Sequence, residues 1–578
     1  MSHPRRQETA DRLIARAGDL PLRLALDPEP DGPPTSLRAA VRAWSSVAED
    51  STHHLVLQDD AIPAPAFFDR VQNIVATAPD AALALFTSWS CRNGAAVRLG
   101  ALRGASWVRA TSEYTPTVAL VLPADVARGY ASFAAAYGEG WSDDVTMLRY
   151  LRSRGVPCLL SVPNLVEHDD VPSVASNDGH GLRSASCYTG EPVDVGRDAE
   201  LRLLEPSVVP FYKYGKALCT VRIGADRWLT YDAERYSRRL GFDAAAFRSV
   251  LRLDGDYGSV DRAALEALCV TAGLTGFLHG EPHTPLADRA IGTLAAGAFS
   301  AEFDVTAAPE LRKRLDELVR AAMHLGATQQ STGFGPGTRS RVVVTGAPHE
   351  LTARLADDLR GQGHTVNLAD TPPDRLPRSA VIVHVGPTGP EDGGTAAQAA
   401  ELGIRRVVRI AVGTGHPAVP AGAGETVLRV DTPYGPGLHE PLTRDLVISA
   451  LTRRPIHLPA PLPPPRQYTH IDDLCRAVER ALIADRPGSY DICSAPPVGA
   501  AELAETVRAA VRRVPIDNEA GAETVAPPAL DAGTARTEIG WSAQVPLDHG
   551  LRTLAQWLAY ETDIGQSSEH QKEVNHGQ

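Results

Sequence analysis

The chain has 578 residues, 43% of them apolar and 22% charged, which is typical of a globular protein with several domains. Its formal net charge of −13 argues against binding to nucleic acid or to an anionic membrane, because both need a basic face. No apolar run is long enough to span a bilayer, the first residues are too polar for a secretory signal, and the seven cysteines form no CxxC pair. We therefore expect a cytoplasmic protein with no membrane partner.

Residues 1–200 alternate between apolar runs and stretches of helical periodicity. The runs at 21–27 and 53–60 are strand-like and end in acidic residues, and 35–50 is helical, with Thr35 or Ser36 placed to cap it. ALALFTSW, PTVALVLP and CLLSVPNLVEH follow as further predicted strands. This alternation predicts an α/β domain with a mostly parallel, doubly wound sheet.

The rest of the chain divides at a linker. Residues 201–335 are predicted to be a largely helical middle region that ends in the Gly/Ser/Thr-rich stretch 327–340. A second series of strands and helices follows over 336–562, and it opens with RVVVTG. The polar residues 563–578 are expected to be a disordered tail.

Acidic residues follow three predicted strands of the first domain. They are Asp27, the pair Asp59–Asp60, and the group Glu167–His168–Asp169–Asp170 in VEHDD. Ligands of open α/β sheets bind beyond the carboxyl ends of the strands, and carboxylates there can hold a Mg²⁺ or Mn²⁺ ion that carries a diphosphate. His168 would favour Mn²⁺. The alternative is that the acidic pair only caps a turn or a helix.

These motifs resemble those of GT-A glycosyltransferases. HHLVLQDDAIPAPAFF is similar to the strand and metal-binding acidic element of that family, and GWSDDVTMLRYLRSRG and NLVEHDD are similar to its acidic helix start and its late histidine. The resemblance implies that Asp59, Asp60 and His168 hold the metal and that Asp143 or Asp144 deprotonates an acceptor hydroxyl. Gln58 departs from the pattern, because many relatives have an acid there.

The resemblance also implies a donor and an acceptor. We expect a metal-dependent glycosyltransferase of a biosynthetic pathway, moving a sugar from a nucleotide sugar to a small-molecule or peptide acceptor. Asp27, Arg38 and Arg42 are the predicted donor contacts; the two arginines lie one helical turn apart and could reach the diphosphate. A solvated helix face explains the same arginines equally well.

The segment RVVVTGAPHELTARLADDLRGQGHTVNLAD resembles the start of extended short-chain dehydrogenases/reductases, the sugar epimerase and dehydratase family. RVDTPYGPG, RQYTHIDDLCRAVERAL and GSYDICSA match later landmarks of that family in the same order. The resemblance implies a Rossmann fold in which Gly346 lies in the phosphate-binding turn and Asp370 binds the ribose. His349 and Thr352 occupy the two other glycine positions, and we expect both side chains to project toward the phosphate path.

The catalytic residues of that second family are missing. Its Tyr-x-x-x-Lys helix has no counterpart, because the chain has no lysine from 314 to 571. Tyr212 and Lys216 have the spacing but lie long before the Rossmann strand. We therefore expect NAD(P) binding to be doubtful and hydride chemistry to be lost, with the domain kept for architecture, ligand binding or homo-oligomer formation. The alternatives are an NAD-dependent nucleotide-sugar epimerase or dehydratase, and a non-enzymatic scaffold.

Overall fold

The structure is a computed structural model. It describes residues 1–16, 22–138, 140–169, 171, 181–190, 201–224, 227–302, 308–329, 340–369, 376–377, 379–387, 399, 401–413, 421–422, 424–517 and 527–561. The chain forms two compact units, an N-terminal unit of Met1–Phe334 with Tyr560–Gln578, and a C-terminal unit of Gly335–Ala559. Within the described ranges, no helix combines the length and the apolar character that crossing a membrane requires.

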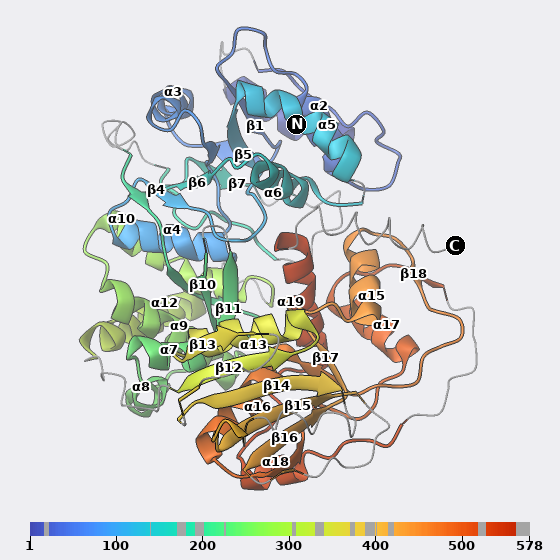
Figure 1. The fold of residues 1–578 in the computed structure, drawn as a ribbon. Coiled ribbons are helices and arrows are strands. Elements are labelled where there is room, and N and C mark those ends of the chain that lie inside the picture. The colour runs from blue at the N-terminus through green and yellow to red at the C-terminus, as the bar shows by residue number, and fades with distance from the viewer. Residues whose placement is uncertain are drawn as a thin grey trace. The chain divides into compact units, whose positions relative to one another are not determined.

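A mixed six-stranded sheet organises the first half of the N-terminal unit (Figure 1). In spatial order its strands are β1 (His53–Leu57), β5 (Ala119–Pro123), β3 (Ala82–Ala84), β6 (Cys158–Ser161), β4 (Trp107–Arg109) and β8 (Leu203–Leu204). The pairs β3–β6 and β4–β8 are parallel, whereas β1–β5, β3–β5 and β4–β6 are antiparallel. The prediction of a mostly parallel sheet here is wrong, because an apolar run does not encode the direction of its strand.

The sheet separates two apolar cores, since side chains alternate between the two faces of a strand. Val56 and Leu120 belong to one core, and Leu57 and Val121 to the other. The helices that accompany the sheet are α1 (Gln7–Arg16), α2 (Leu37–Trp44), α3 (Phe67–Thr77), α4 (Arg92–Leu102), α5 (Ala124–Tyr137) and α6 (Asp143–Ser153). The run 21–27 was predicted as a strand, but of its described residues 22–27 only Leu26 pairs, in an isolated bridge with Ser2.

The middle region contains a small antiparallel sheet as well as helices. Its strands are β9 (Val208–Lys213), β10 (Lys216–Arg222) and β11 (Trp228–Asp232). The helices that follow in the described residues are α7 (Ala233–Leu240), α8 (Ala244–Val250), α9 (Arg262–His279), α10 (Pro285–Ile291), α11 (Leu294–Phe299) and α12 (Pro309–Thr328). Glycine lets α9 and α12 pack backbone to backbone, since a Cβ on Gly326 would lie 1.8 Å from the Gly273 carbonyl oxygen.

The C-terminal unit is built on a fully parallel sheet, drawn yellow to orange in Figure 1. The strands lie in the order β13 (Thr365–Leu368), β12 (Arg341–Gly346), β14 (Val381–Pro387), β15 (Arg406–Val412), β16 (Glu425–Val430) and β20 (Gly488–Asp491). All five neighbouring pairs are parallel. The predicted α/β class is therefore confirmed, and this half does form a second series of strands and helices on a parallel sheet.

Helices cover this sheet, and further helices of the unit form a second, smaller core. Apolar residues of α13 (His349–Gly361) and α16 (Ile471–Ala484) pack together against one face of the strands. The remaining elements are α15 (Pro441–Leu451), α17 (Ala500–Ala510), α18 (Gly533–Glu538), α19 (Leu547–Tyr560), and the short strands β17 (Thr432–Tyr434), β18 (Ile456–His457), β19 (Tyr468–His470) and β21 (Ile516–Asp517). The predicted tail 563–578 lies outside the described residues, as does most of the linker; residues 327–328 belong to α12.

Candidate functional site

The predicted acidic pair and the late histidine lie together in the N-terminal unit. Asp59 and Asp60 follow β1, and the chain then enters β2 (Ala61–Pro63), which pairs with β7 (Val166–His168). In this register Ala61 lies opposite His168, so that His168 Nε2 comes within 3.3 Å of Asp60 Oδ2. The N–H of Asp169 also donates to the Asp60 carbonyl oxygen at 2.7 Å. Asp170 lies outside the described residues.

An arginine that the sequence analysis did not single out binds both carboxylates. Arg6 ends the short helix η1 (Pro4–Arg6), and its Nη2 lies 3.1 Å from Asp59 Oδ1 and 2.9 Å from Asp60 Oδ2. Ser2 Oγ donates to Asp59 Oδ2 at 2.6 Å. Three of the four carboxylate oxygens are thus in contact with Arg6, Ser2 or His168.

Burial and charge act on the two carboxyl groups in different ways. Burial alone would raise the pKa of Asp60, but His168 and Arg6 outweigh it and hold the pKa below its usual value. Burial and the negative charge of Asp60 raise the pKa of Asp59, although the Ser2 hydroxyl and Arg6 oppose that rise. Asp60 is therefore the carboxylate that its neighbours keep ionised.

The acidic pair does not fit a divalent metal ion as it is arranged. Within the part of the chain that the structure describes, no group of three or more His, Cys, Asp or Glu side chains is placed to hold a metal. Mg²⁺ and Mn²⁺ need several oxygen ligands, but the Asp59 and Asp60 oxygens already face a guanidinium. The resemblance implied a Mn²⁺ or Mg²⁺ cofactor, and this geometry does not support one.

Asp143 is joined to the acidic strand end by a chain of hydrogen bonds. It is the first residue of α6, it is buried, and its Oδ2 accepts from Thr117 Oγ1 at 2.8 Å. Thr117 Oγ1 in turn accepts from Gln58 Nε2 at 3.1 Å. Ser36, just before α2, donates to Asp143 Oδ1. The predicted helix-start acid and the predicted strand-end acids therefore lie at one edge of the sheet.

Asp144 has the electrostatic character of a group that exchanges protons near neutral pH. Burial, together with the negative charge of Asp143, raises the pKa of Asp144 to about 6. Its Oδ1 accepts from the Ser142 hydroxyl and, at 2.8 Å, from the Val145 N–H. An aspartate with this pKa is ionised at neutral pH and is still a useful base.

The predicted donor residues lie beside this cluster but are largely bound to each other. Arg38 makes a bidentate ion pair with Asp27, both N–O distances being 2.9 Å. Burial alone would raise the pKa of Asp27, but its hydrogen bonds to Arg38 and to a backbone N–H lower it. Arg42 Nη1 donates to the Leu26 carbonyl oxygen at 3.3 Å. Ser2 links the two acidic groups, since the Asp27 N–H donates to the Ser2 carbonyl oxygen at 3.0 Å.

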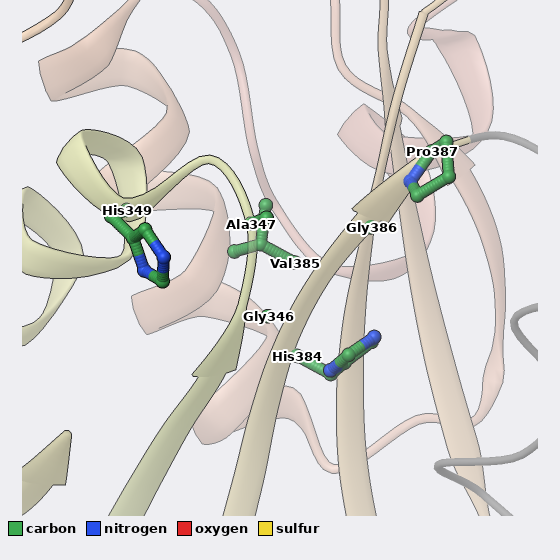
Figure 2. Close-up of a pocket in the computed structure, with 7 residues that line it drawn as sticks. All are labelled: Gly346, Ala347, His349, His384, Val385, Gly386 and Pro387. Atoms are coloured by element: carbon green, nitrogen blue, oxygen red, sulfur yellow. The ribbon is translucent and has the colours of Figure 1, made fainter. Parts of the chain in front are cut away.

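A second site is a pocket at the carboxyl ends of β12 and β14 in the C-terminal unit. These two strands lie at the switch point of the sheet, where ligands of doubly wound folds bind. The pocket has a volume of about 470 Å³ and is lined by Gly346, Ala347, His349, His384, Val385, Gly386 and Pro387 (Figure 2). His384 Nδ1 is 2.9 Å from Thr345 Oγ1, across the β12–β14 pair.

Two positions of the turn at this pocket cannot donate an N–H to the pyrophosphate of a dinucleotide. Such turns bind the pyrophosphate with backbone N–H groups, but the Ala347 N–H donates to the Val385 carbonyl oxygen at 3.0 Å and Pro348 has no N–H. His349 lines the pocket as expected (Figure 2). The expectation for Thr352 is wrong, because its side chain is buried and its hydroxyl donates to the His349 carbonyl oxygen at 2.9 Å.

Backbone conformation and packing together explain the glycine at position 346. Its φ is +98°, and a Cβ there would lie 1.8 Å from the Val385 carbonyl oxygen. Asp370, the predicted ribose contact, lies outside the described residues. Tyr212 and Lys216 lie on the β9–β10 hairpin of the other unit, where Tyr212 pairs with Ala217, and so they do not form a Tyr-x-x-x-Lys helix.

The sequence analysis missed four polar residues of these sites, Ser2, Arg6, Thr117 and His384, and it gave Ser36 only the role of a helix cap. Arg6 carried no sequence signal, because it lies more than 50 residues from the carboxylates it binds. Thr117 lies in the predicted strand PTVALVLP, and His384 interrupts the apolar strand VIVHVG. A polar residue inside or next to such a strand is the signal that could have marked both.

No known protein family and no curated protein matches the sequence. Solved structures similar to it include UDP-glucose 4-epimerase of Thermotoga maritima with UDP-glucose, at 14% identity over 38% of this chain and 98% of that chain, TM-score 0.30. The enzyme WbmF of Bordetella bronchiseptica with NAD⁺ and UDP has 17% identity over 41% and 98%, TM-score 0.33. UDP-N-acetylglucosamine 4-epimerase of Bacillus cereus has 13% identity over 39% and 100%, TM-score 0.31. The α/β class of this chain rests on its own strand order.

Proposed function

We propose that the N-terminal unit is a glycosyltransferase that moves a sugar from a nucleotide-sugar donor to an acceptor hydroxyl. The observation that carries the proposal is the hydrogen-bond chain from Gln58 through Thr117 to Asp143. It holds the acidic start of α6 against the end of the acidic strand, so that a base and a donor site share one edge of the sheet. Open α/β sheets bind their ligands at such an edge.

Asp144 is the proposed base. It takes the proton of the acceptor hydroxyl, the hydroxyl oxygen forms a bond to the anomeric carbon of the sugar, and the bond from that carbon to the diphosphate breaks. The nucleoside diphosphate leaves with the bonding electrons. Asp143 is a positioning residue in this scheme, because both of its oxygens accept from hydroxyl groups of other elements, and its charge keeps the pKa of Asp144 raised.

The donor diphosphate needs positive charge at this edge. Arg38 is committed to Asp27, and Arg6 to the acidic pair. Arg42 has no carboxylate partner among the residues that the structure describes, and we assign it to the diphosphate. The acceptor remains a small molecule or a peptide in this proposal.

The C-terminal unit is proposed to bind a ligand or to support assembly of a homo-oligomer, without hydride transfer. Its pocket lies where doubly wound folds bind ligands, but Ala347 and Pro348 of its turn offer no N–H to a pyrophosphate. The absence of lysine from 314 to 571 removes the cation that the tyrosine base of dehydrogenases and epimerases needs. An NAD-dependent epimerase is therefore the weaker candidate.

A thermal-shift screen of nucleotide sugars tests the proposal. A ligand that binds the folded state raises the unfolding temperature by mass action, and we expect at least one nucleotide sugar to do so in a concentration-dependent way. Arg42→Ala should reduce that shift, whereas Arg128→Ala, which removes another arginine bound only to backbone carbonyls, should leave it unchanged. If no nucleotide sugar shifts the transition, the proposal is wrong.

A further inference from the structure

We infer that Arg6 takes the place of a divalent cation at the Asp59–Asp60 pair, and that the N-terminal unit binds its donor without a metal ion. The second part rests on the proposed function, whereas the first concerns only the acidic pair. The inference comes from the disagreement between the family resemblance, which implies a metal at these carboxylates, and the contacts that the carboxylates make.

The position of Arg6 is that of a bridging cation. One nitrogen, Nη2, contacts both carboxylates, at 3.1 Å from Asp59 and 2.9 Å from Asp60. The side chains of Asp59 and Asp60 are only 6% and 4% exposed, and that of Arg6 is 15% exposed. Two buried carboxylates this close need a positive charge between them, and the guanidinium supplies it.

The N-terminal segment holds Arg6 in place. Ser2 exchanges backbone hydrogen bonds with the segment before α2, donating to Ala25 and accepting from Asp27, at 2.9 and 3.0 Å. The Ser2 side chain bonds Asp59 at 2.6 Å. The segment that carries Arg6 is therefore held both by the chain before α2 and by Asp59 itself.

A metal ion would find too few ligands beside Arg6. Asp60 Oδ1 and His168 Nδ1 are buried and form no hydrogen bond with any residue that the structure describes. One oxygen and one nitrogen do not satisfy Mg²⁺ or Mn²⁺, and the guanidinium repels a second cation. These two atoms are suited instead to the polar groups of a ligand, as is Arg6 Nε, which is also buried and without a partner among described residues.

The residue before the Asp59–Asp60 pair is the neutral Gln58, which is consistent with a singly charged cation such as the Arg6 guanidinium at the pair. Many relatives of the GT-A type have an acid at this position, but here Gln58 donates its amide to Thr117. The pair thus faces Arg6 and the Met1 ammonium, which interacts with both carboxylates, and Gln58 adds no third negative charge. The number of carboxylates at this site is therefore consistent with a guanidinium in place of a divalent cation.

The test is Mn²⁺ binding to the full-length protein, followed by electron paramagnetic resonance of the free ion. Wild type is expected to bind no Mn²⁺ at the pair. Arg6→Ala is expected to gain one site, at least about tenfold tighter than any site of wild type, and the double variant with Asp60→Asn is expected to lose it. Arg6→Lys, which keeps the charge, and Arg5→Ala, which removes an exposed neighbouring arginine, should behave as wild type.

The inference is overturned if wild type binds one Mn²⁺ that Asp60→Asn abolishes, or if folded Arg6→Ala gains no site. If Arg6→Ala does not fold, binding of the donor to wild type tests the inference. A nucleotide sugar should bind wild type equally well with Mn²⁺ and with a chelator. Binding that strictly needs Mn²⁺ refutes the inference. If no nucleotide sugar binds under either condition, the proposed function fails, while the Mn²⁺ titration still decides the role of Arg6.

Discussion

Replacement of the proposed base should stabilise the protein while it removes activity. The folded-state pKa of Asp144 is about 6, against an ordinary value of 3.8. A carboxyl group whose pKa is raised by folding favours the folded state when protonated, and this contribution is lost as the pH rises through the folded pKa. The ionised carboxylate therefore destabilises the N-terminal unit at neutral pH, and Asp144→Asn removes that effect.

The expected size follows from the two pKa values. A difference of about 2 units corresponds to about 3 kcal/mol, and partial exposure of the side chain reduces this to about 1–3 kcal/mol. The free energy of unfolding that Asp144→Asn gains over wild type should grow as the pH rises from about 4 to about 6, and it should stay at this full value up to pH 7.5.

Urea unfolding followed by tryptophan fluorescence measures this directly, because five of the seven tryptophans lie in the N-terminal unit. Asp125→Asn is the matched control, since it removes an exposed carboxylate from the first turn of α5. The reasoning is refuted if Asp144→Asn and Asp125→Asn have the same pH dependence, or if Asp144→Asn destabilises the unit at pH 7.5.

Three further outcomes are expected. Gly346→Ala should lower the free energy of unfolding of the C-terminal unit by about 3 kcal/mol or more, because its Cβ would lie 1.8 Å from a carbonyl oxygen. Gly363→Ala is the control: Gly363 has a similar φ of +92° but open space around it, so this substitution should cost about 1–2 kcal/mol. Equal costs for the two variants would contradict the packing argument. Asp60→Ala should destabilise the N-terminal unit by about 2 kcal/mol in urea unfolding, because it leaves Arg6 buried with one carboxylate; an unchanged midpoint would mean that the ion pair contributes nothing. Calorimetry with NAD⁺ and NADP⁺ should show no stoichiometric binding, and incubation with UDP-glucose and NAD⁺ should form no 4-epimer of the sugar; stoichiometric binding or formation of the epimer would restore the epimerase alternative.

The parallel half of the fold was predictable because its signal is local. Strands buried on both faces are continuous apolar runs, and RVVVTG and AVIVHVG differ from the observed β12 and β14 by at most one residue at either end. The mixed sheet of the N-terminal unit was not predictable in this way. Whether β5 runs with or against β1 depends on the path of the connecting chain, which the apolar residues do not specify.

The candidate site was predictable only in part, for a related reason. Sequence motifs indicated Asp59, Asp60 and His168, and the β2–β7 pairing does bring them together. The role of the pair depended on its partners, however, and Arg6 reaches it only through tertiary structure. A motif names the carboxylates, but the cation they bind is decided by which distant side chain folds onto them.

The central claim is that the N-terminal unit cleaves a nucleotide sugar with Asp144 as base and without a metal ion. The most direct test is the release of nucleoside diphosphate from the nucleotide sugar that binds best, with water or an alcohol as acceptor and a chelator present. Wild type should release the diphosphate, and Asp144→Asn should do so at least about a hundredfold more slowly while still binding the donor. Equal rates for the two proteins, or release only after Mn²⁺ is added, would contradict the account.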